Sequence, residues 1–395
     1  EYWNAYKRLR NKANNALKNA KCNYYNKKLN QQKDDPRGTW KTINNLMGNH
    51  SVHQTINEIK LNNEKVSSPA EIAECFNNYF VEISAKLAAN IDGINSRTNF
   101  KDFVSGTTSK FDFIFTNESK VLKVIKKLSS FKATGLDGLS TKILKIASPM
   151  VSQSLTFLFN IIIATGNFPT EWKKARVSPL FKAVTRNELE NYRPISVLPV
   201  ISKVFERILY DQLYSYISTH NLLTNKQFGF RRLHSTMTAL LGSTNSWQLN
   251  MDRGLFNIVV FVDLKKAFDT VDHEILIQKL ELYGLSNASL GLMQSYLSER
   301  KQSCVIQNNR SKERLVTCGV PQGSILGPLL FLLYINDLPN CLETSTPTLF
   351  ADDTNITISG TNAADVENKA NLEMARIHDW LLANKLHLNV AKTEF

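Results

Sequence analysis

Two adjacent aspartates interrupt a stretch that otherwise alternates like a β-strand, LFADDTNI at residues 349–356. Successive strand residues point to opposite faces, so Asp352 and Asp353 can act on one ion only if the chain turns there. The order Asp-Asp-Thr-Asn favours such a turn. Neighbouring carboxylates repel each other, and burial strengthens the repulsion unless a divalent cation relieves it. The stretch therefore predicts a hairpin whose tip is either a cation site or an ordinary solvated turn.

A second strand-like run, IVVFV from Ile258, ends at another carboxylate, Asp263. Alone, an aspartate at a strand end is typical of a cap or an ion-pair partner. Together with the aspartate pair it offers hard oxygen ligands without His or Cys nearby, a set that suits Mg²⁺ or Mn²⁺ better than Zn²⁺. Such a set can hold two ions that activate a hydroxyl and stabilise a leaving oxygen in phosphoryl transfer. We therefore expect the three aspartates to meet around divalent cations.

A third segment, TCGVPQGSILGPLLF from Thr317, places a glycine-containing loop before an apolar run. Its glycines permit a ligand to approach the backbone closely, Pro321 stiffens the turn, and Gln322 offers both a donor and an acceptor. The N-terminus of a following helix favours anions. The segment fits a ligand-binding loop, and it also fits a tight loop that caps a core helix.

The chain is strongly basic, with 48 Lys and Arg against 35 Asp and Glu and a formal net charge of +13. This excess favours polyanionic partners, nucleic acid before acidic membrane surfaces. It is concentrated at the start, because residues 1–50 hold 11 Lys or Arg and only three acids. Five scattered cysteines without a CxxC pair argue against a disulfide framework or a zinc site and favour a reducing compartment.

The pattern at the start of the chain predicts helix. Apolar and aromatic residues recur at steps of three and four over residues 3–24, with Lys and Arg on the other face. The stretch KDDPRGTW at 33–40 favours a turn, and residues 42–115 indicate a partly helical connector. Because the first residue is Glu1 and not Met, we expect this sequence to be a piece of a larger polypeptide.

Helices and short strands alternate further along, which indicates an α/β or α+β protein. We expect a helix capped by Thr116, an apolar helix at 155–164 and a strand from Val177. The apolar runs from Leu155 and Ile325 are about half the length that a membrane span needs, so both are predicted to be buried elements.

The order of the motifs resembles that of a known family. FVDLKKAFDTVDH, GVPQGSILGPLLF, FADD and NKLHLNVAKT are similar to motifs A, B, C and D of reverse transcriptases. KATGLDG and NYRPISVLP resemble the additional fingers motifs of non-LTR (LINE-type, Jockey-like) retrotransposon enzymes. The resemblance covers residues 116–395 and implies an α+β right-hand polymerase fold, with helical fingers at 116–250 and an antiparallel-sheet palm at 251–395. Before these it implies a basic helical linker to an upstream endonuclease at 1–50 and a variable connector at 51–115.

Transferred residue by residue, the resemblance implies that Asp263, Asp352 and Asp353 bind two Mg²⁺ ions, for which Mn²⁺ could substitute. Lys392 matches a lysine proposed as general acid toward the pyrophosphate leaving group. The implied nucleotide-binding residues are Phe268, Gln322, Gly323, Arg193 and Lys182. Arg231 and Arg232 are the implied contacts to the nucleic-acid backbone.

Each nucleotide-binding residue has an implied role, and for Phe268, Arg193 and Lys182 a plain structural alternative stands beside it. Phe268 falls where the family has an aromatic gate against the ribose 2′-OH, and otherwise it is a core ring. Gln322 and Gly323 would contact the incoming nucleotide and the template base. Arg193 and Lys182 would clamp the triphosphate, and otherwise they are solvated surface charges.

The resemblance implies an RNA-directed DNA polymerase that extends a primer 3′-OH with dNTPs. Its partners would be an RNA template and a DNA primer or target, with no membrane, and its location the cytoplasm and nucleus. The family's thumb would lie beyond Phe395. Three alternatives stay open: a decayed or domesticated copy that binds nucleic acid without catalysis, an RNA-dependent RNA polymerase, and a group II intron maturase on the same palm.

Overall fold

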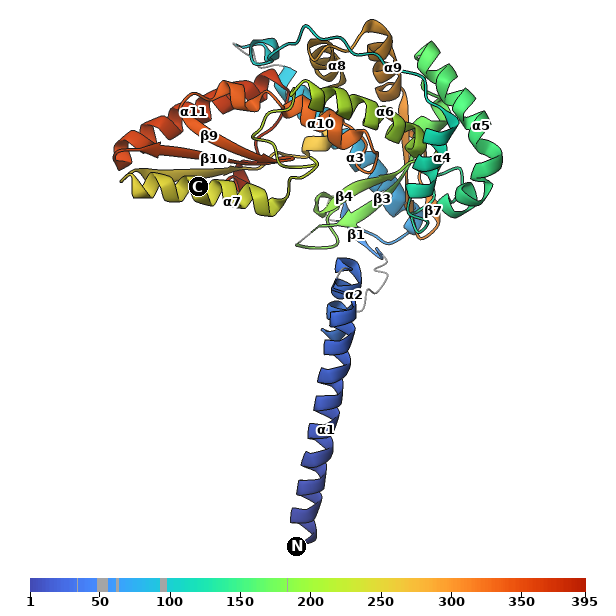
Figure 1. Cartoon of the computed structure of the whole chain (residues 1–395), viewed down its shortest axis with the longest axis vertical. Helices are drawn as coiled ribbons and strands as arrows, with labels where there is room; N and C mark the ends of the chain where they lie inside the picture. The colour runs from blue at the N-terminus through green and yellow to red at the C-terminus, as the bar shows by residue number, and fades with distance from the viewer. Residues whose placement is uncertain (34, 48–55, 62–63, 93–97, 183) are drawn as a thin grey trace. The chain divides into compact units, whose positions relative to one another are not determined.

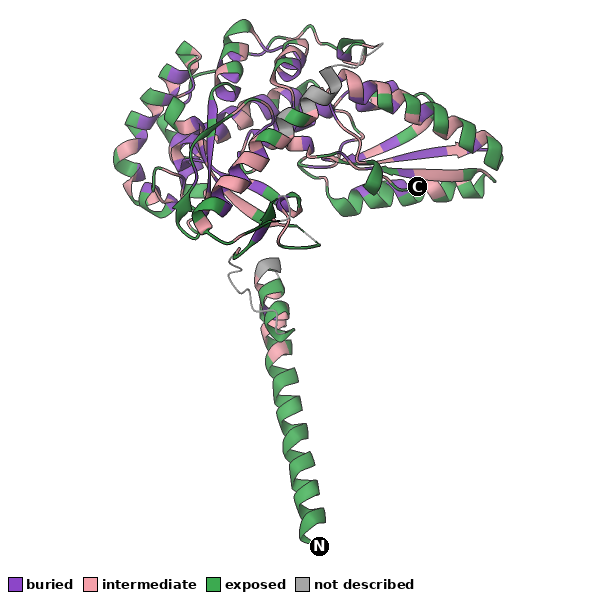
Figure 2. Ribbon diagram, turned by 180° about the vertical axis from the view of Figure 1, so that it is seen from behind, coloured by how far each residue is buried: buried purple, intermediate pink, exposed green. Residues whose placement is uncertain are grey.

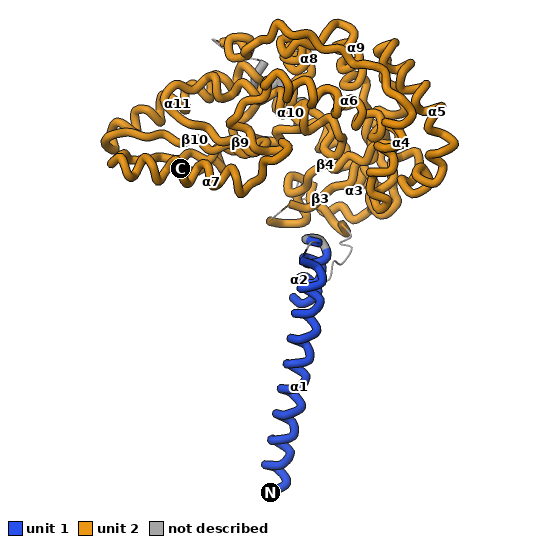
Figure 3. Tube along the Cα trace, in the orientation of Figure 1, with its two compact units in different colours: residues 1–55 blue, residues 56–395 orange. Residues whose placement is uncertain are grey.

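The computed structural model describes residues 1–33, 35–47, 56–61, 64–92, 98–182 and 184–395 (Figure 1). The chain divides into two compact units, residues 1–55 and residues 56–395 (Figure 3). The finer division at 115/116 and 250/251 stays a prediction.

The described residues of the first unit form two helices. The first, α1 (Tyr2–Gln31), confirms the long helix that the sequence predicts, and none of its residues is buried (Figure 2). The second, α2 (Pro36–Leu46), begins inside the stretch 33–40, so the predicted turn is wrong for its second half. The physical reason is that proline fits the first turn of a helix, where its missing N–H costs no hydrogen bond.

The second unit is a mixture of helices and small sheets, which confirms the α+β class. Its α-helices are α3 (Pro69–Asp92), α4 (Glu118–Lys127), α5 (Thr141–Thr165), α6 (Val200–Thr219), α7 (Thr236–Asp252), α8 (His273–Leu282), α9 (Asn287–Leu297), α10 (Gly327–Ile335) and α11 (Ala363–Ala383).

In the part of the chain that the structure describes, three sheets accompany these helices. An antiparallel three-stranded sheet has the order β5 (Phe256–Val262), β10 (Asp353–Gly360), β9 (Ser345–Phe350). A five-stranded sheet has the order β4 (Tyr192–Val197), β3 (Lys174–Phe181), β6 (Arg300–Ile306), β7 (Asn309–Arg310), with β8 (Arg314–Val316) also paired to β6. Strands β1 (Ile59–Leu61) and β2 (Glu64–Val66) form a separate antiparallel pair. The strand predicted from Val177 is part of β3.

Helices α7 and α11 cover opposite faces of the three-stranded sheet (Figure 1). On β10, the side chains of Asn355 and Thr357 are hydrogen-bonded to Ser243 and Trp247 of α7. The alternate residues, such as Ile356, are instead buried in the main core, to which α11 contributes. Because side chains alternate along a strand, Asp353 lies on the same face as Asn355.

Helix α10 lies in the centre of the main core. Apart from Pro328, all of its residues are buried, as expected for a helix that is apolar on every side. It begins three residues after the loop at 319–324, so the predicted order of loop and apolar helix is confirmed. The loop is therefore attached to a rigid element.

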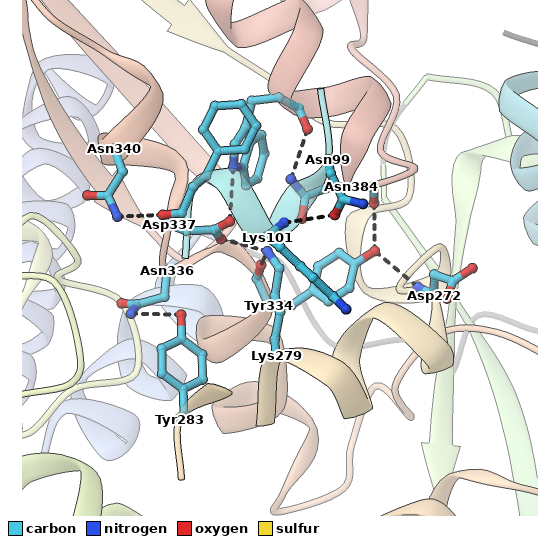
Figure 4. Close-up of polar contacts among 12 residues, drawn as sticks. Asn99, Lys101, Asp272, Lys279, Tyr283, Tyr334, Asn336, Asp337, Asn340 and Asn384 are labelled. Atoms are coloured by element: carbon cyan, nitrogen blue, oxygen red, sulfur yellow. Dashed lines mark hydrogen bonds and ion pairs between the residues drawn. The ribbon is translucent and has the colours of Figure 1, made fainter. Parts of the chain in front are cut away.

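A buried ion pair ties three helices together at the end of α10 (Figure 4). The Nζ atom of Lys279, on α8, lies 2.6 Å from Oδ1 of Asp337 and donates to the carbonyl of Tyr334 at 2.6 Å. The indole of Trp380, on α11, donates to the other Asp337 oxygen at 3.3 Å. Burial lowers the pKa of Lys279 to about 8, although Asp337 acts in the opposite direction.

Helix α4 begins one residue later than the sequence predicts. Asn117 and not Thr116 is its N-cap, because the Asn117 side chain accepts a hydrogen bond from the N–H of Lys120 at 2.9 Å. Thr116 is buried, and its own N–H donates to Asn160 on α5 at 2.8 Å. Local preference favours Thr116 as the cap, but its tertiary contact with Asn160 leaves that role to Asn117.

Helix α5 is longer and more exposed than predicted. By length and composition it is the one described helix that could cross a membrane, and 28% of its most apolar window is buried. The expectation that the run at 155–164 is buried is wrong for Phe157 and Ile161, which are 69% and 41% exposed. Core helices pass the same test, so α5 alone does not indicate a membrane protein.

Candidate active site

The register of the three-stranded sheet brings Asp263 next to Asp353. β10 runs antiparallel to β5, with Thr354 opposite Val262. Asp263 follows Val262 and Asp353 precedes Thr354, so one more step of this register sets the two aspartates against each other. Both line a cavity of about 590 Å³, together with Lys392 and the first turns of α7.

A tight turn places Asp352 beside this pair. Phe350 and Asp353 are strand partners across the hairpin, which leaves Ala351 and Asp352 as the two turn residues. Ala351 has φ +57°, as hairpin turns of this length require at their first central position. The predicted turn at the aspartate pair is thus confirmed. Burial raises the pKa of Asp352, and the charges of Asp353 and Asp263 add to the rise.

Asp263 is held by Asn389, in the segment after α11. The Asn389 backbone N–H donates to the carbonyl of Asp263 at 2.8 Å, and its side-chain amide donates to Asp263 Oδ2 at 2.5 Å. Three residues later, Lys392 ends a short 3₁₀ turn (Val390–Lys392). One segment therefore carries both the partner of Asp263 and the predicted general acid.

The predicted cations gather near the same aspartates. Burial lowers the pKa of Lys182, and the charges of Arg193 and Lys392 lower it further, whereas Asp263 raises it. Arg193 also lowers the pKa of Asp352. Lys182 follows β3, Arg193 lies on β4, and Lys392 comes from the far end of the chain. The fold thus brings together residues that are remote in sequence.

The loop at 319–324 is anchored on both sides. The carbonyl of Gln322 accepts from the N–H of Ser196 on β4 at 2.7 Å, and its side-chain Nε2 donates to Asp269 Oδ1 at 2.8 Å. Burial raises the pKa of Asp269 to about 6, against the effect of this hydrogen bond. Gly323 has φ +123°, and a Cβ there would lie 2.4 Å from the Ser196 oxygen, so only glycine fits.

Three predicted residues remain, one proposed for the nucleotide and two for the nucleic-acid backbone. Phe268, half-buried, packs against Phe331 of α10. Arg231 donates to the carbonyls of Thr224 and Gln227 at 2.7 and 3.1 Å. Arg232 is exposed, and its guanidinium lies 5.2 Å from the ring centre of Tyr214. Part of Arg231 is therefore used inside the protein, while Arg232 is accessible. Their contact with nucleic acid stays a prediction.

Comparison with known proteins identifies the family. A model of the family described as reverse transcriptase (RNA-dependent DNA polymerase) matches residues 180–395, more than half of the chain. This chain belongs to the reverse transcriptase family. The match contains each residue of the candidate site, from Lys182 to Lys392.

Curated relatives place this reverse transcriptase near the polymerases of non-LTR retrotransposons. It is 34% identical over 221 residues to the probable RNA-directed DNA polymerase from transposon BS of Drosophila melanogaster, covering 56% of this chain and 24% of that protein. With the X-element polymerase of the same species the identity is 32% over 279 residues, 69% of this chain and 31% of the relative.

A third relative is also a retrotransposon polymerase. The RNA-directed DNA polymerase from mobile element jockey of Drosophila melanogaster is 30% identical over 241 residues, 61% of this chain and 26% of that protein. The predicted relationship to Jockey-like elements is confirmed. The matched region spans only 24% to 31% of the length of these relatives.

Reverse transcriptases generally use divalent metal ions, and the donor set here fits them. Three carboxylates supply hard oxygen ligands. Burial first, and the charges of Asp353 and Asp263 in addition, raise the pKa of Asp352, and a bound cation would offset both effects. Among the described residues, no group of three or more His, Cys, Asp or Glu is already arranged as a metal site. The convergence of Asp263, Asp352 and Asp353 on shared ions therefore stays a prediction.

Sequence reasoning missed three residues of this reverse transcriptase site. Asn389 contacts Asp263, Asp269 orients Gln322, and Gln227 contacts the turn that carries Asp352. Asp269 and Asn389 lie inside the quoted motifs, and Gln227 begins QFGFRRLHST. Their partners are remote in sequence, however, so the motif strings alone did not reveal their contacts.

Proposed function

We propose that this chain catalyses RNA-directed DNA synthesis for a non-LTR retrotransposon, adding dNTPs to a primer 3′-OH on an RNA template. The observation that carries the proposal is the strand register that sets Asp263 against Asp353, with Asp352 in the adjoining turn. The family match over residues 180–395 supports the same reaction. In this assignment the three-stranded sheet is the palm of a right-hand polymerase, and residues 116–250 form helical fingers.

Asp263, Asp352 and Asp353 are the residues proposed to hold two Mg²⁺ ions, for which Mn²⁺ can substitute. When bound, such ions activate the attacking hydroxyl and stabilise the leaving oxygen. The chain's own contribution is to keep the carboxylates ionised and oriented. Arg193 opposes the rise in the pKa of Asp352, and Asn389 holds one oxygen of Asp263 in place.

The surrounding residues are assigned to the incoming nucleotide. Lys182 and Arg193 bind the triphosphate, Arg193 through a two-pronged guanidinium and Lys182 as a point charge. Lys392 is assigned to protonate the pyrophosphate leaving group, and its position in the lining of the cavity with Asp263 and Asp353 supports this assignment. Phe268 excludes the ribose 2′-OH, while Gln322 and Gly323 contact the nucleotide and the template base.

The nucleic-acid partners are an RNA template and a DNA primer or target. The net charge of +13 supports binding to phosphate backbones, with Arg231 and Arg232 as contacts. The curated relatives are much longer than the matched region, so we assign the reaction to a longer polypeptide that also carries an endonuclease and works in the cytoplasm and nucleus.

A primer-extension assay tests the proposal, on poly(rA) with oligo(dT) and on a heteropolymeric RNA, for this chain and for the longer polypeptide that contains it. Asp352→Asn is expected to lower the extension rate by about a hundredfold or more, because it removes charge where the reaction needs it. Asp252→Asn, an exposed carboxylate at the end of α7, is the control and should extend normally. Equal rates for Asp352→Asn and the unmutated protein would falsify the proposal. RNA binding without any extension would instead indicate a catalytically decayed copy.

A further inference from the structure

The segment that contains Gln227 lies along the end of β9, next to the catalytic turn. The N–H of Phe228 donates to the carbonyl of Leu349 at 2.8 Å, and the N–H of Leu349 donates to the carbonyl of Lys226 at 2.9 Å. These bonds make a parallel bridge between Gln227 and Leu349, two residues before Ala351. This backbone pairing positions Gln227 beside the turn.

The side chain of Gln227 bonds to both polar backbone groups of Ala351. Its Oε1 accepts from the N–H of Ala351 at 2.9 Å and from the N–H of Gly229 at 2.8 Å. Its Nε2 donates to the Ala351 carbonyl at 3.4 Å. The reversed amide would set NH₂ against two N–H donors, so the surroundings select one orientation. Gln227 is 1% exposed, which leaves water little part in these bonds.

Ala351 needs this support because its backbone is strained. At φ +57° its Cβ crowds the backbone, a cost that glycine would avoid. Ala351 is only 6% exposed, so its N–H and carbonyl would be left without partners if Gln227 were absent. A Cβ on Gly229 would lie 2.2 Å from the Ala351 nitrogen, so the two backbones are in direct contact.

We propose that Gln227 is a positioning residue that fixes the conformation of Ala351 and thereby aims Asp352 and Asp353 toward Asp263. The inference rests on the proposed function and adds a residue that touches no substrate. An amide is required because one group must accept from an N–H and donate to a carbonyl on the same residue. Hydrocarbon side chains of equal volume can fill the space but cannot hold the turn.

Three variants of the chain of residues 1–395 test this role. Gln227→Met keeps the volume and removes the bonds, and Gln227→Asn keeps a buried amide that is one methylene too short to reach Ala351. Gln302→Met is the matched control, because Gln302 is also buried and its Nε2 donates to Asn77 at 3.1 Å, away from the turn. Thermal unfolding reports the stability that each variant loses.

The decisive readout is the affinity for Mn²⁺, measured directly by electron paramagnetic resonance. Asp352→Asn, which lacks one of the proposed ligands, serves as the reference for lost binding. Both Gln227 variants are expected to weaken this binding about tenfold or more, as loss of a residue that orients metal ligands usually does. The Mg²⁺ concentration for half-maximal extension should rise by a similar factor, with KM for primer–template unchanged. Gln302→Met should lower the melting temperature by a similar amount. Its Mn²⁺ affinity and its Mg²⁺ concentration for half-maximal extension should stay unchanged.

Two results would overturn the inference. One is normal Mn²⁺ binding by a folded Gln227→Met or Gln227→Asn protein. The other is equal weakening in Gln302→Met, which would make the effect one of general stability. If the unmutated chain binds Mn²⁺ but extends no primer, the proposed function fails, and the Mn²⁺ comparison alone still decides the role of Gln227.

Discussion

The rings of Phe268 and Phe331 are stacked, with centroids 4.2 Å apart and an angle of 20° between their planes. Phe331 is fully buried in α10, so it holds Phe268 against a rigid element. The carbonyl of Phe268 also accepts from the N–H of Val320, in the loop that carries Gln322. The proposed gate is therefore fixed on two sides and has little freedom to give way to a 2′-OH.

Replacing Phe268 by Val should open this gate. The ratio of kcat/KM for dNTPs to that for rNTPs is expected to fall by about tenfold or more, because the smaller side chain leaves room for the 2′-OH. Single-nucleotide incorporation with matched dNTP and rNTP measures the ratio. Phe256→Val, which removes an exposed ring from β5, is the control. An unchanged ratio argues against the gate, and an unmutated protein that uses rNTPs as readily as dNTPs favours an RNA polymerase.

Asn389→Asp should impair extension more than Asn389→Ala. Alanine only frees the Asp263 oxygen that Asn389 holds, whereas aspartate replaces the donor with a charge that repels it. We expect a loss of about tenfold or more for alanine. Measuring the extension rate at increasing Mg²⁺ concentrations tests both variants. The control is Val390→Ala, because the side chain of Val390 is 73% exposed. If Asn389→Asp extends as fast as the unmutated protein at low Mg²⁺, the contact has no role.

Asp269 should make folding stability depend on pH. Burial raises its pKa to about 6, above the ordinary 3.8, so between these values the native state binds a proton that the unfolded state has lost. The free energy of unfolding contributed by this group therefore falls as pH rises through the window and is flat above it. Near pH 4 the native carboxyl is protonated and neutral like an amide, so urea unfolding of the unmutated protein and Asp269→Asn should differ least there. The difference should grow as pH rises to about 6, with the unmutated protein the less stable of the two. A difference that does not vary from pH 4 to 7 would contradict the shifted pKa.

Breaking the buried ion pair of Lys279 and Asp337 should lower the free energy of unfolding far more than breaking a surface ion pair. Lys279→Met leaves a charge without its partner, which is expected to cost about 3–5 kcal/mol. Adding Asp337→Asn should recover part of this loss, because the amide is neutral and its oxygen can still accept from Trp380. Urea unfolding measures both variants.

The control for this pair is Lys65→Met, which breaks a surface ion pair of 3.5 Å with Glu58. Its effect should be below about 1 kcal/mol, since exposed pairs contribute little. A double variant that is no more stable than Lys279→Met would show that the unpaired charge is not the source of the loss.

Local patterns predicted the elements of the site well. Asp263 at a strand end, the turn at Asp352 and Asp353, and the loop before α10 each follow from short-range chemistry: strand alternation, turn propensity and glycine content. The cap of α4 was missed because Asn160, far along the chain, binds Thr116 and leaves Asn117 to cap. Local sequence preference carries no information about a hydrogen-bond partner that lies so far along the chain.

The amino-acid sequence by itself determined which residues are chemically able to act: carboxylates at strand ends, cations in the fingers motifs and an aromatic ring after Asp263. The tertiary structure decided which of them meet and what orients them. The register of β5 with β10 sets Asp263 against Asp353, and Asn389 and Gln227 reach their partners across 126 and 124 residues. Hydrogen bonds act over a few ångströms in space, and only the folded backbone converts those long sequence separations into contact.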